Sequence, residues 1–136
     1  MKKNSHLKIY TDGGARGNPG PAGIGILICN TENKCKKYSE YIGKTTNNQA
    51  EYKALIFALE KAKKLNPLKV TCYLDSELVV KQLNGSYRVK NEGLKPLFAK
   101  AENLASFFPK ITFSHIPREK NKQADKLVNK AIDKKT

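Results

Sequence analysis

The sequence lacks any apolar run of about eighteen residues, the length that a membrane-spanning helix needs. Its opening residues, MKKNSHLKIY, pass from two lysines into an alternating pattern and show neither the apolar stretch nor the cleavage site of a secretion signal. Internal repeats and low-complexity linkers are missing as well. We therefore expect one compact domain over residues 1–136, located in the cytoplasm.

Cysteine is scarce, and the three residues are Cys29, Cys35 and Cys72. Their number is odd, and no pair has the C-x-x-C spacing typical of zinc sites. A disulfide framework or a zinc site is therefore not expected. We predict three reduced thiols that serve as packing residues.

Acidic residues are also few: 12 Asp and Glu stand against 26 Lys and Arg, which gives a net charge of +14. An excess of this size favours a polyanionic partner, and nucleic acid is the natural one. Only three of the basic residues are arginines, so part of the excess can reflect a lysine-rich composition that keeps a small protein in solution. Charge thus favours nucleic acid without identifying it.

Alternation of apolar and polar residues predicts three strands at the start of the chain. They cover residues 7–12, 23–29 and 36–42. Turn-forming residues between them favour an antiparallel meander. The period then changes, because apolar residues recur every three or four positions over residues 45–66. That pattern predicts a helix with Thr46 or Asn47 as its N-cap.

The second half of the chain alternates between strands and helices. The predicted elements are a buried strand over 69–75, a short helix between Ser76 and Gly85, a helix over 94–107, a strand over 111–116 and a helix over 121–135. The basic tail, about residues 132–136, is expected to fray from Lys130 onward. The order βββαβααβα predicts an α/β fold, in which helices cover a mixed sheet and the later strands run parallel to the first.

Four acidic residues lie at the ends of these elements. Asp12 ends the first predicted strand and Asp75 ends the fourth. If these strands are parallel neighbours, their carboxylates lie about 5 Å apart at the edge of the sheet where functional crevices form. Glu51 and Asp125 lie in the first turns of two predicted helices, each next to an alanine of the buried stripe.

Each of the four also has an ordinary structural role open to it. Asp12 can begin a turn, Asp75 can form a helix cap with Ser76, and acids favour helix N-termini. Clustered carboxylates, however, repel one another and raise one another's pKa unless cations neutralise them. As a group they favour two-metal cleavage of phosphodiesters, with Mg²⁺ held by oxygen ligands.

A glycine-rich loop follows Asp12 in the stretch TDGGARGNPGPAG. Glycines let the backbone approach a polyanion, and Asn18 with the N–H groups of the turn can bind a phosphate or a 2′-hydroxyl. The loop matches neither G-x-G-x-x-G nor G-x-x-x-x-G-K-[ST], so a nucleotide cofactor is not expected.

Four stretches resemble the signature blocks of ribonuclease H, type 1, in the order of that family. They are YTDGGARGNPGPAG, TTNNQAEYKAL, LDSELVVKQLNG and IPREKNKQADKLV. The match covers roughly Lys8 to Ala131, and four ordered blocks are far more specific than one glycine motif. The resemblance implies an α/β ribonuclease H-like fold, with a five-stranded mixed sheet in the order 3-2-1-4-5 flanked by helices.

The resemblance also implies an endonuclease that hydrolyses the RNA strand of RNA–DNA hybrids with two Mg²⁺ or Mn²⁺ ions per site. The family's catalytic and metal-binding acids fall on Asp12, Glu51, Asp75 and Asp125. Its RNA contacts fall on Gly13, Gly14, Arg16, Gly17, Asn18, Asn47, Asn48, Gln49 and Ser76. For the asparagine pair, helix capping is an equal alternative. A monomer is expected, with double-stranded RNA as a further substrate and no membrane partner.

The loop before the last acidic residue departs from the family pattern. Many members carry a mobile histidine there, and ungapped spacing gives that place to His115. Alignment on IPRE instead leaves His115 in the strand and puts Arg118 and Glu119 in a shortened loop. Alternation favours the second alignment, with Arg118 or Glu119 as the loop's functional side chain or as a surface ion-pair residue.

Residues 84–97 are too few for the extra helix and basic protrusion of many bacterial members. Hybrid binding would then depend on the general lysine field, with Arg88, Lys90 and Lys95 as phosphate contacts, and would weaken steeply with salt. Two other classes stay open: a non-catalytic module that binds hybrids or double-stranded RNA, and a 3′ exonuclease or strand-transfer enzyme on the same fold. The four carboxylates argue against the first, and the asparagine pair before Glu51 argues against the second.

Overall fold

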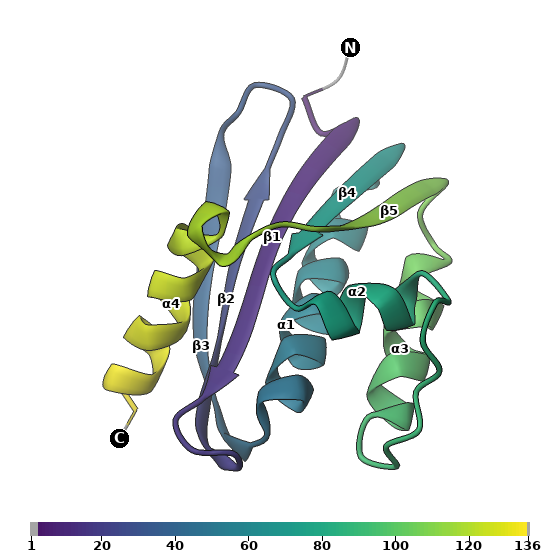
Figure 1. Ribbon diagram of the computed structural model, residues 1–136. Coiled ribbons are helices and arrows are strands. Elements are labelled where there is room, and N and C mark those ends of the chain that lie inside the picture. The colour runs from purple at the N-terminus through teal and green to yellow at the C-terminus, as the bar shows by residue number, and fades with distance from the viewer. Residues whose placement is uncertain (1–2, 136) are drawn as a thin grey trace.

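The computed structural model describes residues 3–135 of the chain. Its elements are β1 (His6–Ala15), β2 (Gly20–Cys29), β3 (Cys35–Thr45), α1 (Asn47–Lys63), β4 (Lys69–Leu74), α2 (Glu77–Leu83), α3 (Lys95–Ala105), β5 (Lys110–His115), a 3-10 turn (Arg118–Lys120) and α4 (Lys122–Asp133). The strands form one sheet in the order β3-β2-β1-β4-β5 (Figure 1). β1 pairs antiparallel with β2 and parallel with β4, so the predicted mixed sheet and its strand order are confirmed.

Helices cover the two faces of the sheet unequally. In Figure 1, α1 lies behind the sheet and α4 lies in front of β2 and β3. The helix α3 packs against α1, and the main core lies on this side of the sheet. Leu7 and Ile9 of β1 and Leu55 and Leu59 of α1 are fully buried there. Burial of each such side chain contributes about 2 kcal/mol of transfer free energy.

The start of α1 follows from local sequence. The Thr46 hydroxyl accepts a hydrogen bond from the Gln49 N–H (3.2 Å), and the Gln49 side chain accepts one from the Thr46 N–H (3.3 Å). This capping box satisfies two N–H groups at the start of the helix. Thr46 is thus the N-cap, and Asn47 and Asn48 lie in the first turn, where they can make other contacts.

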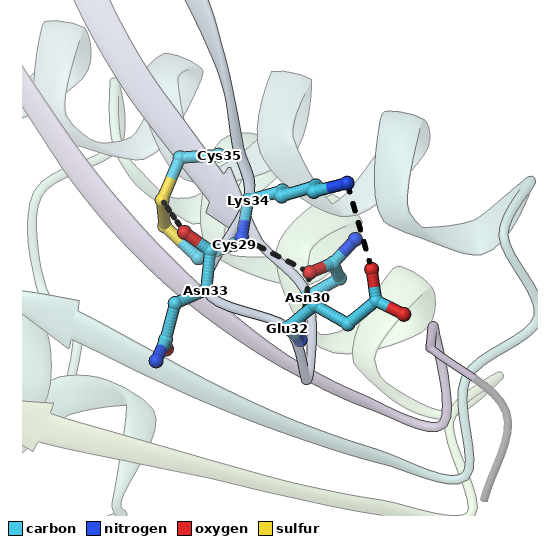
Figure 2. The surroundings of a disulfide bond; sticks show 6 residues. All are labelled: Cys29, Asn30, Glu32, Asn33, Lys34 and Cys35. Atoms are coloured by element: carbon cyan, nitrogen blue, oxygen red, sulfur yellow. Dashed lines mark hydrogen bonds and ion pairs between the residues drawn. A yellow bond between two sulfur atoms is a disulfide. The ribbon is translucent and has the colours of Figure 1, made fainter.

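The cysteine prediction is wrong for two of the three residues. Cys29 ends β2 and Cys35 begins β3, and the antiparallel register places them opposite each other, where they form a disulfide (Figure 2). The turn between them is closed by Asn30 Oδ1, which accepts a hydrogen bond from the Lys34 N–H (3.1 Å). The cysteine count and spacing carry no information about this cross-strand register. Cys72 is a buried free thiol, as predicted.

Three further observations concern the ends and links of elements. α4 continues to Asp133, so the predicted fraying from Lys130 is wrong, and an ion pair joins Asp133 to Arg16 (2.6 Å) in the β1–β2 loop. The link over residues 84–94 contains turns and no additional helix, as its length predicted. Within residues 3–135, no helix is both long and apolar enough to cross a membrane.

Candidate active site

The parallel ladder between β1 and β4 ends at the pair Thr11 and Leu74. Asp12 and Asp75 follow directly, so both carboxylates leave the same end of neighbouring strands. β1 itself continues to Ala15, paired with β2, and the prediction that Asp12 ends its strand is therefore wrong. The end of the parallel ladder, rather than the end of a strand, brings the two residues together.

Glu51 reaches the same place from α1. It is only 7% exposed, and its Oε1 accepts a hydrogen bond from the Gly13 N–H at 2.6 Å. Glycine is required at this contact, because a Cβ at Gly13 would overlap the Ala50 carbonyl oxygen. The glycine that follows Asp12 thus lets helix and strand approach closely enough for Glu51 to join the two aspartates.

Asp125 comes from α4 and depends on a second glycine. Gly25 of β2 is paired with Asp12 in the β1–β2 ladder. A Cβ at Gly25 would overlap the Ala124 carbonyl oxygen, so the missing side chain lets the first turn of α4 lie directly on the sheet. The next residue after Ala124 is Asp125, which α4 thereby brings close to Asp12.

The four predicted carboxylates line one cavity of about 420 Å³. Carboxylate oxygens of Asp12, Glu51 and Asp75 all lie within 4.8 Å of one another, a spacing that can hold a metal ion. Carboxylate oxygens are the donors that suit Mg²⁺ and Mn²⁺. The chemistry and spacing of these residues therefore fit a divalent cation.

Because the cluster is buried, ionising all of its carboxylates at once is unfavourable in free energy. It raises the pKa of Asp12 to about 7; a hydrogen bond with Glu51 opposes this rise, and the charges of Asp75 and Asp125 add to it. Burial also raises the pKa of Glu51 well above its usual range, and the charge of Asp12 adds to the effect. A bound cation would remove this repulsion, because it favours the ionised forms.

Comparison with known proteins identifies the family. A family model described as reverse transcriptase-like matches residues 10–131. Ribonuclease H of Trichodesmium erythraeum is 33% identical in an alignment that covers 98% of this chain and 92% of that protein. The chain belongs to the ribonuclease H family.

Other relatives of this ribonuclease H-family chain have higher identity. The bifunctional protein Rv2228c of Mycobacterium tuberculosis is 42% identical over 127 residues, which are 92% of this chain and 35% of that protein. The chain therefore spans about a third of the length of this relative. The crystal structure of LC11-RNase H1 in complex with an RNA/DNA hybrid is 52% identical, with a TM-score of 0.89 and coverage of 94% of this chain and 97% of that one.

The sequence did not reveal the role of Asn121, the residue directly before α4. Its side chain makes no capping hydrogen bond and is 2% exposed. Nδ2 instead donates to the Thr11 carbonyl oxygen (2.9 Å) and to Asp75 Oδ2 (3.0 Å). Asn121 therefore links the end of the parallel ladder to the start of α4. An asparagine directly before a helix suggests a cap, and only the fold supplies its actual partners.

The predicted RNA contacts divide into two groups. Those that line the carboxylate cavity are Gly13, Gly14, Arg16, Asn47, Asn48 and Ser76, and those that do not are Gly17, Asn18 and Gln49. Asn18 Oδ1 accepts from the Asn47 N–H (3.0 Å), and Asn47 Oδ1 accepts from the Ala15 N–H (2.8 Å). These bonds tie the glycine-rich loop to α1. Gln49 is used in the capping box, and Ser76 caps α2.

Three residues are candidates for the role of the mobile loop histidine that many ribonucleases H carry, and they lie in different places. His115 is the exposed last residue of β5, the position that the second alignment predicts, and it does not line the carboxylate cavity. Arg118 lines that cavity. Glu119 lines a separate hollow beside Lys8 and Tyr10. Of the three, Arg118 is the one that lies at the carboxylates.

Proposed function

We propose that this protein is an endoribonuclease that hydrolyses the RNA strand of RNA–DNA hybrids with two Mg²⁺ or Mn²⁺ ions per site. One observation carries the proposal: three carboxylates from β1, α1 and the end of β4 lie within 4.8 Å of one another in a chain whose net charge is +14. Outside this cavity the charge favours polyanions, and inside it the carboxylates favour divalent cations.

In this proposal Asp12, Glu51, Asp75 and Asp125 hold the ions. When bound, the ions supply an activated water and stabilise charge on the leaving oxygen. The chain's own part is to fix the ligands before binding. The Gly13 N–H orients Glu51, and Asn121 orients Asp75 through Oδ2. Such fixed partners around metal ligands tune orientation and affinity.

The cavity wall supplies the proposed contacts to the RNA strand. Gly13 and Gly14 expose backbone, and Asn48 and Ser76 offer polar groups to phosphates or 2′-hydroxyls. Arg16 and Arg118 supply positive charge at the rim, with further phosphate contacts from Arg88, Lys90 and Lys95. For Gly17, Asn18 and Gln49 we propose a role in shaping the loop and the helix start, since the two polar side chains bond within the protein.

The rest of the proposal concerns the substrate, the domain and the oligomeric state. The structure of LC11-RNase H1 with an RNA/DNA hybrid supports hybrid binding by a chain of this fold. We propose residues 1–136 as one catalytic domain that acts as a monomer in the cytoplasm, with double-stranded RNA as a second substrate. A non-catalytic binding module is disfavoured, because clustered carboxylates repel the phosphates that such a module must hold.

The first experiment is cleavage of an end-labelled RNA–DNA hybrid, beside single-stranded RNA, double-stranded RNA and duplex DNA, with Mg²⁺, Mn²⁺ or a chelator. Internal cuts in the RNA of the hybrid are expected, and they should disappear with the chelator. The variant Asp12→Asn should lower the cleavage rate by about ten-thousandfold or more. Glu40→Gln, which removes an exposed carboxylate from β3, is the matched control and should keep full activity.

Other outcomes would contradict the proposal in distinct ways. Hybrid binding without cleavage in either metal would indicate a binding module. Products that depend on a strand end would indicate an exonuclease, and joined DNA would indicate strand transfer. Full activity of Asp12→Asn in Mg²⁺ would remove Asp12 from the metal site.

A further inference from the structure

Among residues 3–135, no helix packs over β4 and β5 on the sheet face that carries the carboxylates. The helix α4 packs against β2 and β3 and lies beside their lower part at the left of Figure 1, where the link from β5 to α4 crosses in front of the sheet. Above that crossing the strands are open. We call this area the open sheet surface and define it by Lys8 and Tyr10 of β1, Lys69 and Tyr73 of β4, and Lys110 and Thr112 of β5.

Strand alternation places these side chains on the same face as the catalytic aspartates. In β1, Leu7, Ile9 and Thr11 are buried toward α1, so Lys8, Tyr10 and Asp12 point the other way. In β4, Val70, Cys72 and Leu74 are buried, so Lys69, Tyr73 and Asp75 share the open side. Tyr10 and Tyr73 therefore lie two residues, about 7 Å along the strands, from Asp12 and Asp75.

The two tyrosines form an aromatic pair at the centre of this surface. They are opposite each other in the parallel ladder, and their rings stack with centroids 4.9 Å apart and planes at 21°. Tyr10 packs against Leu27 on the β2 side. On the β5 side the residue in register with Tyr73 is Ser114, a small side chain that leaves space above it. Tyr73 is half-buried, and the face of its ring away from Tyr10 lies on the side of this small residue.

Tyr10 lines one hollow of this surface, and a second hollow adjoins the first. Two cavities of about 450 Å³ each lie on this side and share Lys8 and Asn33 in their walls. Lys69 lines one of them, and Lys120 and Lys122 line the other. Glu119 is the single carboxylate in either wall. Arg118, two residues before Lys120, faces the carboxylate cavity, so the link between the two regions is basic on both sides.

We infer that the open sheet surface binds an unpaired nucleic-acid tail that continues from the hybrid held at the carboxylates. Bases stack on aromatic side chains of a sheet, and lysines beside them hold the backbone phosphates, as in single-strand binding modules. The inference rests on the proposed function and names a preferred substrate: hybrids with single-stranded extensions. The alternative, that the tyrosine pair only stabilises the sheet, predicts no effect of a tail.

The test uses the Asp12→Asn background, so that binding is measured without cleavage. Fluorescence anisotropy compares a flush-ended hybrid with the same hybrid carrying a tail of about six nucleotides, long enough for one single-strand site. Separate arms place the tail on the RNA or on the DNA, at the 5′ or the 3′ end. At least one tail should tighten binding by about tenfold, the effect of one stacked base.

Variants test whether the tighter binding of a tailed hybrid depends on the open sheet surface. Tyr73→Ala should remove this gain and Tyr73→Phe should keep it, whereas Tyr41→Ala, which removes an exposed tyrosine of β3, should leave it unchanged. Lys8→Gln should reduce the gain and flatten its salt dependence, with Lys64→Gln at the end of α1 as the matched control. If Tyr73→Ala fails to fold in a thermal melt, Lys8→Gln decides the question.

Two results would overturn the inference. One is that no tail tightens binding, and the other is that the gain survives both Tyr73→Ala and Lys8→Gln. Wild-type cleavage of the flush hybrid separates this failure from failure of the proposed function. A flush hybrid that is cut while tails add nothing defeats the inference alone. A flush hybrid that is bound and never cut defeats the proposed function, and the tail comparison is interpreted as before.

Discussion

The two faces of the sheet differ in composition, although they share the same strands. Toward α1, β1 presents Leu7 and Ile9, which lie in the main core, and Thr11, which is also buried. Toward α4 the same strand presents Lys8, Tyr10 and Asp12, which stay partly or fully exposed. Alternate residues of one strand therefore contribute to stability or to chemistry, depending on the face they point to.

The carboxylates lie where the two faces meet. Asp12 and Asp75 belong to the α4 side, Glu51 enters from α1, and Asp125 is added by α4. Two glycines make this meeting possible, Gly13 under α1 and Gly25 under α4. The comparison predicts that substitutions on the α4 side change activity more than stability, except where a glycine or Asn121 holds a helix in place.

The largest expected change in stability comes from pH, because the site is the one place within residues 3–135 where a carboxylic acid is buried. The folded-state pKa of Asp12, about 7, lies above its unfolded value near 4. Its contribution to stability is therefore fully present below about pH 4 and is lost as pH rises through about 7. Metal-free protein should lose stability between about pH 4 and pH 7, and Mg²⁺ should restore it at the upper end.

Thermal melts of wild type and Asp12→Asn across this pH range isolate the effect from the general excess of positive charge. The variant should be as stable as the wild type at about pH 4 and more stable at about pH 8 without metal. Parallel pH profiles for the two proteins would contradict burial of charge at Asp12.

Gly25→Ala should lower both the stability of the fold and the affinity of the site for metal, although Gly25 lies on the α4 side of the sheet. The added methyl group would meet the Ala124 carbonyl oxygen and push α4 outward, at a cost of about 1–3 kcal/mol. Metal affinity should fall with stability, because Asp125 moves with the helix. Urea unfolding and metal titration measure the two effects. Gly14→Ala, where a Cβ has only ordinary contacts, is the control for stability.

Asn121→Ala should show how far stability and metal binding depend on one amide. Loss of Nδ2 leaves the Thr11 carbonyl and Asp75 Oδ2 without their donor, which should cost about 1–3 kcal/mol. Asn121→Asp should be at least as costly, because it puts a further carboxylate beside Asp75. Asn129→Ala, at an exposed asparagine of α4, should change unfolding by much less. Equal losses in the Asn121→Ala and Asn129→Ala variants would contradict the positioning role of Asn121.

The smallest effect is expected at His115, which lies outside the carboxylate cavity. His115→Ala should leave the cleavage rate within a few-fold of wild type, and Arg118→Ala should lower it more. Rates on the flush hybrid under saturating Mg²⁺ provide the measurement. A loss of about a hundredfold for His115→Ala, the lower end of a general acid–base contribution, would give His115 the role of the mobile family histidine.

Much of this arrangement could be predicted from sequence, because alternation and helical periodicity are local signals. They gave the strands, the Thr46 cap and the proximity of Asp12 and Asp75. The disulfide of Cys29 with Cys35 depends on cross-strand register, which composition does not reveal. Likewise, the partners of Asn121 lie 46 and 110 positions away, beyond any local pattern. The roles of the site residues stay predictions until the variants are measured.

The placement of Asp125 in α4 has a consequence for the timing of biosynthesis. Asp12, Glu51 and Asp75 leave the ribosome well before the final helix of the described fold. A nascent chain therefore carries an incomplete set of the proposed ligands until residues 122–133 have emerged and docked on β2. Under the proposed function, docking of this last described helix on the sheet is therefore the step that completes the metal site.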